Sequence, residues 1–240
     1  MSGHSKWSQI KRQKEKTDIK KGLTFTKLAN AIIIAVREGG GIVDPNQNFR
    51  LRLAIDSARA FNMPKENIER AIQRAVKKEE GDIEEVIYEG FAPGGVSVVV
   101  EAATDNPQRT TAQIKNLFNK AGGSFGQPGS VLYQFTQVGK ITVEKNGNTF
   151  DEIFSIALEN GAEDIEEEAG NVFVFTKGSE LSKMRDKLMQ NGFKILDASL
   201  TRKPTITTEV SDPQQHKKIE DFLESISNLE DVQNVYSNLA

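Results

Sequence analysis

The stretch that decides the fold is residues 139–202, GKITVEKNGNTFDEIFSIALENGAEDIEEEAGNVFVFTKGSELSKMRDKLMQNGFKILDASLTR. Apolar residues alternate in some parts of it, as in strands, and recur at i, i+3 and i+4 in others, as in helices. The predicted strands are Lys140–Glu144, Glu163–Glu168, Asn171–Thr176 and Lys194–Leu200. One predicted helix presents Phe150, Ile153, Phe154, Ala157 and Leu158, and the other presents Leu181, Met184 and Leu188. The order strand, helix, strand, strand, helix, strand predicts a complete ferredoxin-like α/β domain.

The sequences on either side of this stretch each supply part of a second α/β domain. The predicted strands before and after it are Val96–Ala103, Val131–Phe135, Ile206–Val210 and Val232–Tyr236. Asp105-Asn106-Pro107 and Ser211-Asp212-Pro213 each open a helix between two of these strands. Glu85–Phe91 adds a hairpin strand through the turn Pro93-Gly94-Gly95. We therefore expect residues 139–202 to be inserted into a discontinuous domain built from residues 81–138 and 203–240.

The first 80 residues are predicted to form a basic arm followed by a helical domain. Helical apolar spacing occurs in a segment that ends at Gly39-Gly40-Gly41, in residues 46–61, and in a segment that opens at Pro64. The apolar stripe of this third helix is Ile68, Ala71, Ile72, Ala75 and Val76. A set of cations shares another face of it: Arg70, Arg74, Lys77 and Lys78. That face could follow a phosphate backbone, or it could be a solvated face whose cations pair with Glu66 and Glu69.

Together these segments predict an α+β fold class. It consists of an N-terminal three-helix domain plus two ferredoxin-like α/β domains, one inserted in the other. The expected boundaries are 1–80 for the arm and helical domain, 81–138 plus 203–240 for the discontinuous domain, and 139–202 for the inserted domain.

The average charge of the chain conceals a strong division. The net charge is -3. Residues 1–78 contain 17 Lys/Arg and 7 Asp/Glu, a net of +10, whereas residues 79–240 contain 14 and 27, a net of -13. A basic head on an acidic body indicates binding of a polyanion through one end, because the body would repel the same partner.

The positive charge is densest in the first 21 residues, MSGHSKWSQIKRQKEKTDIKK. Seven of these residues are cationic and two are acidic, and Trp7 is the only tryptophan in the protein. Such a segment buries too little apolar surface to order itself, so a phosphate-rich partner would order it on contact. The alternative is a solvated terminal arm that only aids solubility.

Several classes of function find no support in the sequence. The absence of cysteine excludes disulfides, a thiol nucleophile and a thiolate metal site. No apolar run approaches the roughly 20 residues that span a bilayer. His4 and His216 have no metal-ligand spacing, and no glycine cluster matches a phosphate-binding loop. We therefore expect a cytoplasmic protein with no catalytic residues, no metal, no cofactor, no small-molecule substrate and no membrane partner.

Two further clusters have structural explanations. The acidic run Glu163–Glu168 could suggest a magnesium-dependent nuclease, but neighbouring strand residues point to opposite faces, so its carboxylates diverge. A polar sheet face is favoured there. The tract Thr104–Thr111, TDNPQRTT, is typical of a helix N-terminus, and only Arg109 is left over for a phosphate or a partner.

Several short motifs in order along the chain resemble the YebC family. They are GHSKW at Gly3–Trp7, IK at Ile10-Lys11, FTKL at Phe25–Leu28, NMPKENIERAI at Asn62–Ile72, YEG at Tyr88–Gly90, TDNPQRT at Thr104–Thr110 and GSVLYQF at Gly129–Phe135. Mitochondrial members of this family are translational activators of cytochrome c oxidase. One departure is the insertion of Ile42-Val43 into the connection between the first two helices.

The resemblance implies a three-domain, non-enzymatic protein without a catalytic or metal site. Bacterial members are commonly described as probable transcriptional regulators that bind DNA. Other members act as translation factors on the ribosome, near the peptidyl-transferase centre, and relieve stalling on proline-rich sequences.

The resulting hypothesis is a gene-expression factor that binds nucleic acid through its N-terminal domain. The candidate nucleic-acid contacts are His4, Lys6, Trp7, Lys11, Arg12, Lys14, Lys16, Lys20, Lys21, Lys27, Arg70 and Arg74. The cations would neutralise phosphates, Trp7 would stack on a base or ribose, and His4 would donate a hydrogen bond. Arg70 and Arg74 form a second set.

The type of nucleic acid stays open at this point. A DNA reader places a folded helix in the major groove, whereas an unstructured basic segment suits clefts in ribosomal RNA. The common description favours DNA. A competing class is a protein-interaction scaffold whose basic arm binds an acidic partner.

Overall fold

The computed structural model describes residues 18–77, 83–168 and 170–240, and within these ranges the side chains from residue 24 onward. The chain divides into two compact units. The first unit comprises Met1–Phe135 and Pro204–Ala240, and the second comprises Thr136–Lys203. The second unit therefore interrupts the first in the sequence. The separation of residues 1–80 as a third domain stays a prediction.

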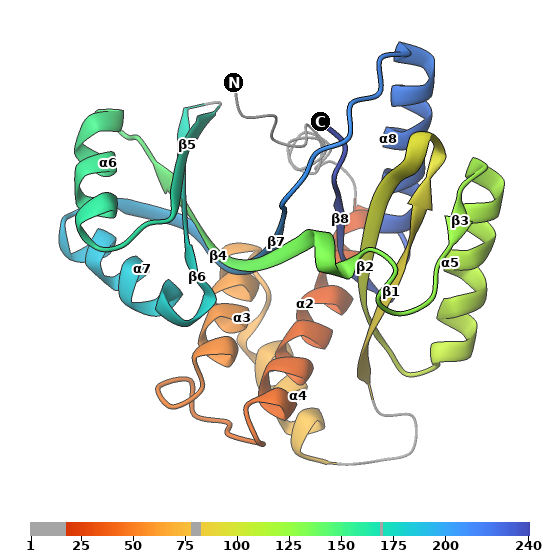
Figure 1. The fold of residues 1–240 in the computed structure, drawn as a ribbon. Helices are drawn as coiled ribbons and strands as arrows, with labels where there is room; N and C mark the ends of the chain where they lie inside the picture. The colour runs from red at the N-terminus through yellow and green to blue at the C-terminus, as the bar shows by residue number, and fades with distance from the viewer. Residues whose placement is uncertain (1–17, 78–82, 169) are drawn as a thin grey trace. The chain divides into compact units, whose positions relative to one another are not determined.

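The second unit contains the elements expected from residues 139–202. In chain order they are β4 (Phe135–Glu144), α6 (Phe150–Glu159), β5 (Asp164–Glu168), β6 (Asn171–Lys177), α7 (Leu181–Gln190) and β7 (Lys194–Pro204). The sheet has the strand order β5-β6-β4-β7, and β6 is antiparallel to both of its neighbours. Helices α6 and α7 cover one face of this sheet (Figure 1). The other face carries Phe173 and Phe175.

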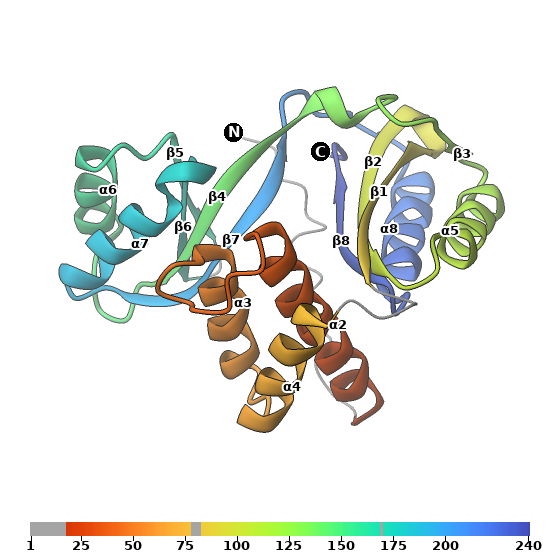
Figure 2. The same cartoon turned by 90° about the horizontal axis from the view of Figure 1, so that it is seen from below.

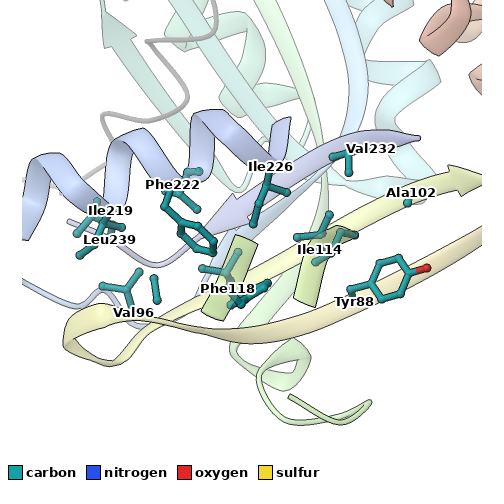
Figure 3. Packing of buried hydrophobic residues seen from close by; sticks show 14 residues of the cluster. Tyr88, Val96, Ala102, Ile114, Phe118, Ile219, Phe222, Ile226, Val232 and Leu239 are labelled. Carbon is teal, nitrogen blue, oxygen red and sulfur yellow. The ribbon is translucent and has the colours of Figure 1, made fainter. Parts of the chain in front are cut away.

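The first unit contains a second four-stranded sheet. Its strands are β1 (Glu84–Ala92), β2 (Val96–Thr104), β3 (Ser124–Phe125) and β8 (Val232–Ser237), in the order β3-β1-β2-β8, and all neighbours are antiparallel. Helices α5 (Pro107–Ala121) and α8 (Pro213–Ser227) lie on the same side of it (Figure 2). Their apolar faces meet in the core of Figure 3, where the rings of Phe118 and Phe222 are 4.9 Å apart in an edge-to-face arrangement.

Three helices precede this sheet, as predicted: α2 (Asp18–Glu38), α3 (Phe49–Ala60) and α4 (Lys65–Val76). Their shared core includes Ile32, Val36 and Leu51, all fully buried, and it extends to Ala103 of β2. The fold class is therefore confirmed: an α+β chain with an N-terminal three-helix region and two four-stranded antiparallel sheets with helices. None of the described helices is long and apolar enough to cross a membrane.

A single asparagine organises the connection between α2 and α3. The side-chain oxygen of Asn48 accepts a hydrogen bond from the N–H of Leu51 (3.1 Å) and caps α3. Its Nδ2 donates to the carbonyls of Ala35 (2.9 Å) and Ile42 (3.0 Å). Only glycine fits at position 39, because a Cβ there would lie 2.2 Å from this Nδ2.

The predicted strand Val131–Phe135 is wrong. Leu132–Gln134 form a 3-10 turn, and β4 begins only at Phe135. The reason is a buried carboxylate, that of Glu89 on β1. It accepts hydrogen bonds from the backbone N–H groups of Gly129 (2.6 Å), Val131 (2.7 Å) and Leu132 (2.7 Å). These donors are therefore occupied by a side chain, and the two-residue strand β3 lies beside β1 instead.

The predicted strand Ile206–Val210 is also wrong. Among its residues, only Thr208 forms a bridge, with Leu239 near the C-terminus. The N–H of Thr208 donates to the carbonyl of Asn238 (2.7 Å), and Ile206 is 68% exposed. The alternation of apolar and polar residues was present, but the backbone of this segment bridges only to the chain end that follows the edge strand β8, while Val210 packs against the core of the first unit.

Three residues assigned to apolar helix stripes are exposed. Val76 at the end of α4 is 59% exposed. On α6, Ile153 and Ala157 are fully buried, whereas Phe154 and Leu158 are 39% and 56% exposed. The stripe of α6 is thus wider than the surface that the sheet covers.

Candidate nucleic-acid interface

Most of the predicted nucleic-acid contacts lie outside the described residues. These are His4, Lys6, Trp7, Lys11, Arg12, Lys14 and Lys16. Lys20 and Lys21 lie in the first turns of α2, and their side chains are not among those described. The expectation that the first 21 residues form an unstructured arm therefore needs one correction, because the helix already begins at Asp18.

Lys27 on α2 has a structural contact. Its Nζ donates a hydrogen bond to the carbonyl of Ser227, 2.6 Å away, at the last residue of α8. A cation at a helix C-terminus satisfies an unpaired carbonyl and interacts favourably with the helix dipole. Lys27 thereby joins the helical region to the sheet-covering helix, and its contact with phosphate stays a prediction.

Arg70 and Arg74 lie on the exposed face of α4, with Lys77 directly after the helix. The opposite face packs Ile68, Ala71 and Ala75 into the core. Of the two nearby acids, Glu69 pairs with Lys65 (3.4 Å) and not with an arginine. Within the part of the chain that the structure describes, neither Arg70 nor Arg74 forms an ion pair. Two guanidinium groups one helical turn apart are thus available to a phosphate backbone.

Arg109, the unexplained cation of the TDNPQRTT tract, is bound to two carboxylates. Its Nη2 lies 2.9 Å from Asp105 and 2.9 Å from Asp231. Asp231 also accepts hydrogen bonds from the hydroxyls of Thr104 (3.1 Å) and Thr110 (2.5 Å). Burial raises the pKa of Asp231, but the hydrogen bonds from these three residues outweigh burial and keep that pKa below its ordinary value. This cluster joins the start of α5 to the start of β8.

The acidic run Glu163–Glu168 also has a local partner. Asp164 and Glu166 face the same side of β5, as predicted, and the ammonium of Lys203 donates to both, at 3.0 Å to Glu166. Burial raises the pKa of Glu166 to about 7, and the neighbouring Asp164 adds to the rise while Lys203 opposes it. The ammonium of Lys203 thus binds the two carboxylates that a metal cation would need as ligands. Across the described residues, no group of three or more acidic or histidine side chains could hold a metal ion.

Two family profiles match the chain, one over the region of the three N-terminal helices and one over the region of the two sheets. The TACO1/YebC protein N-terminal domain matches residues 5–78, and the TACO1/YebC second and third domain matches residues 83–239.

This chain belongs to the TACO1/YebC family.

The relatives of this TACO1/YebC chain extend over its whole length. A protein of Caldanaerobacter subterraneus subsp. tengcongensis, named "Probable transcriptional regulatory protein", is 44% identical over 241 residues, which cover 100% of this chain and 98% of that protein. A protein of the same description from Thermotoga maritima is 45% identical and covers 99% of this chain and 93% of its own. The crystal structure of the conserved hypothetical protein Aq1575 from Aquifex aeolicus has a TM-score of 0.91 and 41% identity, and covers 98% of this chain and 97% of that one.

The structure gives several of the TACO1/YebC motif residues a packing role. In the YEG motif, the hydroxyl of Tyr88 donates to the carbonyl of Pro107 (3.3 Å), and Glu89 binds the GSVLYQF segment through its backbone. Gly90 is required because a Cβ there would lie 2.6 Å from the ring of Phe118. The role of Glu89 escaped the sequence analysis, because its three donors lie about forty residues away.

Proposed function

We propose that this TACO1/YebC family member is a non-enzymatic, nucleic-acid-binding regulator of gene expression in the cytoplasm, and that its target is DNA. The observation that carries the proposal is the charge division, +10 over residues 1–78 against -13 over residues 79–240. A net charge of this size on one end concentrates a polyanion there and repels it elsewhere. DNA is supported by the description of the relatives as probable transcriptional regulatory proteins.

The interface combines two parts of the N-terminal region. The first part is the basic segment from His4 to Lys21, which supplies cations and the stacking side chain of Trp7. The second part is the exposed face of α4, where Arg70 and Arg74 have no ion-pair partner among the described residues. The first part supplies most of the affinity because it has most of the cations.

The second candidate function is that of a ribosome-associated factor. Such a factor would bind ribosomal RNA near the peptidyl-transferase centre and relieve stalling on proline-rich sequences. The interface for RNA uses the same cations, since phosphate contacts do not depend on sequence. The favouring observation is that α4 has only 12 residues, with Arg70 and Arg74 one turn apart on its outer face, which suits backbone contact more than base readout.

Fluorescence anisotropy with a duplex DNA and an RNA hairpin of matched length tests this proposal. Three variants are compared with the full chain: a deletion of residues 1–17, which leaves α2 intact, the double variant Arg70→Ala/Arg74→Ala, and Arg59→Ala as the control. Arg59 is also exposed but lies on α3 beside Asp56. Each phosphate contact that is lost should lower the salt slope, d log K/d log[salt], by about 0.9 for duplex DNA.

The expected result is a large loss of affinity and salt slope for the deletion, a smaller loss for the arginine pair, and little change for Arg59→Ala. Tighter binding of the RNA hairpin at equal salt would select the ribosomal alternative. Unchanged affinity and slope in the deletion would overturn the site and favour the third class, a protein-interaction scaffold.

A further inference from the structure

The acidic charge of the second unit is concentrated on two adjacent elements. From Phe150 to Gly170, a segment that contains α6 and β5, the sequence has eight Asp/Glu and no Lys/Arg. Cations from elsewhere in the unit neutralise part of this charge, since Lys203 binds Asp164 and Glu166, and Lys145 binds Glu167 (2.7 Å). Neither of these two lysines forms an ion pair with an acidic side chain of α6 in the described structure.

An apolar row runs along α6 beside these acids. Phe150, Phe154 and Leu158 are spaced four residues apart, so they form one ridge about 12 Å long. The rings of Phe150 and Phe154 are stacked in a tilted pair with centroids 5.6 Å apart. Phe154 and Leu158 are among the exposed large apolar residues of the protein. Single exposed apolar residues are common, whereas these two lie in one row with the half-buried Phe150 and form a continuous apolar surface.

The neighbouring row of α6 is polar and acidic. It contains Asp151, Ser155 and Glu159, again four residues apart and all exposed. Among the described residues, no Lys or Arg forms an ion pair with Asp151 or Glu159. The surface thus offers an apolar ridge with a negatively charged margin, which we call the α6 ridge (Phe150, Phe154, Leu158, Asp151 and Glu159).

We propose that the α6 ridge is a docking surface for a cationic amphipathic helix of a partner protein. Apolar side chains of such a helix, spaced at i and i+4, would pack between the phenylalanines and Leu158 in the way that ridges of one helix fill grooves of another. Its Lys or Arg side chains would lie opposite Asp151 and Glu159. Opposite charges at the margin of an interface speed association and fix its orientation.

Charge decides between the possible occupants. A nucleic acid would bring phosphates to a segment with eight acids and no cation, which repels it. A second copy that presents the same ridge would place Asp151 and Glu159 against the same two acids of the other copy. A cationic helix is the occupant that complements both the apolar row and its margin. This inference does not depend on the nucleic-acid function. It concerns acidic and apolar residues of the second unit, whereas the nucleic-acid function depends on the cations of residues 1–78.

The test uses a synthetic amphipathic helix of about four turns with leucines at i, i+4 and i+8 and lysines elsewhere. A second peptide of the same composition has its leucines dispersed, so it keeps the charge and loses the apolar row. The affinity of each peptide for the full chain is measured by fluorescence anisotropy. The ridge variant is Phe154→Ser/Leu158→Ser, and the matched control is Val43→Ser/Val76→Ser, which removes two exposed apolar side chains of the first unit (45% and 59% exposed).

The patterned peptide should bind the full chain and the control variant equally, and the ridge variant about tenfold or more weakly. The charge variant Asp151→Lys/Glu159→Lys, which keeps the apolar row, should weaken binding and reduce its salt dependence. Equal binding of the two peptides, or equal binding to ridge and control variants, would overturn the proposal. So would self-association of the chain that the ridge variant abolishes, or competition by single-stranded RNA at the ridge.

Discussion

Glu89 is a buried carboxylate that determines the path of a whole loop. At 3% exposure it accepts three backbone hydrogen bonds from residues 129–132, at 2.6 to 2.7 Å. Charge-assisted bonds of this length are about twice as strong as neutral ones, and they replace the water that a buried carboxylate loses. The loop conformation therefore depends on one side chain.

The substitution Glu89→Ala should destabilise the protein by about 3 kcal/mol, because three buried donors lose their acceptor. Urea unfolding followed by circular dichroism would measure the change. Glu163→Ala is the control, since Glu163 is exposed on the second unit and its side chain caps no loop in the described structure. Equal stability of the two variants would show that water or another group replaces the carboxylate.

Glu166 gives the second unit a pH-dependent stability. Its folded pKa of about 7 is above its ordinary value of 4.5, so the folded state binds a proton more tightly than the unfolded state does. Its contribution is most favourable below pH 4.5 and is lost as the pH rises through 7. The loss is on the order of 1–3 kcal/mol.

The variant Glu166→Gln should remove this dependence. We expect the difference in unfolding free energy, variant minus parent, to grow between pH 5 and pH 8 in urea titrations. Glu167→Gln is the matched control, because Glu167 is the next residue and faces the other side of β5, where it pairs with Lys145. A difference that stays constant over this pH range would show that the carboxyl of Glu166 ionises normally.

At the scale of elements, the connection between α2 and α3 depends on Asn48. It caps α3 and bonds two carbonyls of the preceding helix and loop. Asn48→Ala should cost about 2 kcal/mol, the sum of a lost cap and of buried groups left unpaired. Thermal unfolding would measure the effect against Asn46→Ala, whose exposed side chain bonds only to Asp44 in the described structure. A similar shift in both variants would contradict the role of Asn48.

At the scale of the whole molecule, the second unit is an insertion whose two connections lie together. The N–H and hydroxyl of Thr205 both donate to the carbonyl of Gln134, at 2.8 and 3.0 Å. The first unit thus brings its own chain ends into contact where the second unit leaves and returns. A compact unit with adjacent ends tolerates replacement of an insert.

Replacing Thr136–Lys203 by a Gly/Ser turn of about three residues should leave the first unit folded. The shortened protein should unfold cooperatively and bind nucleic acid as the full chain does, but it should not bind the cationic helix peptide. Circular dichroism, thermal unfolding and the two anisotropy assays would check these outcomes. Loss of cooperative unfolding would show that the first unit depends on the second.

Much of this molecule follows from local sequence patterns. The alternation and helical spacing in residues 139–202 predicted all four strands and both α-helices of the second unit, because near neighbours along the chain decide which face of a helix or strand is apolar. The charge division and the family motifs are likewise properties of the sequence alone.

Only the tertiary structure decided which partner each polar group finds. Residues 131–135 had the pattern of a strand, yet the donors of Val131 and Leu132 bind Glu89, which is far away in sequence. Arg109 is bound by Asp231 for the same reason. Phe154 and Leu158 fit an apolar stripe, but the sheet covers only part of α6. Periodicity specifies the faces of an element, whereas burial and hydrogen-bond partners depend on what the folded chain brings beside it.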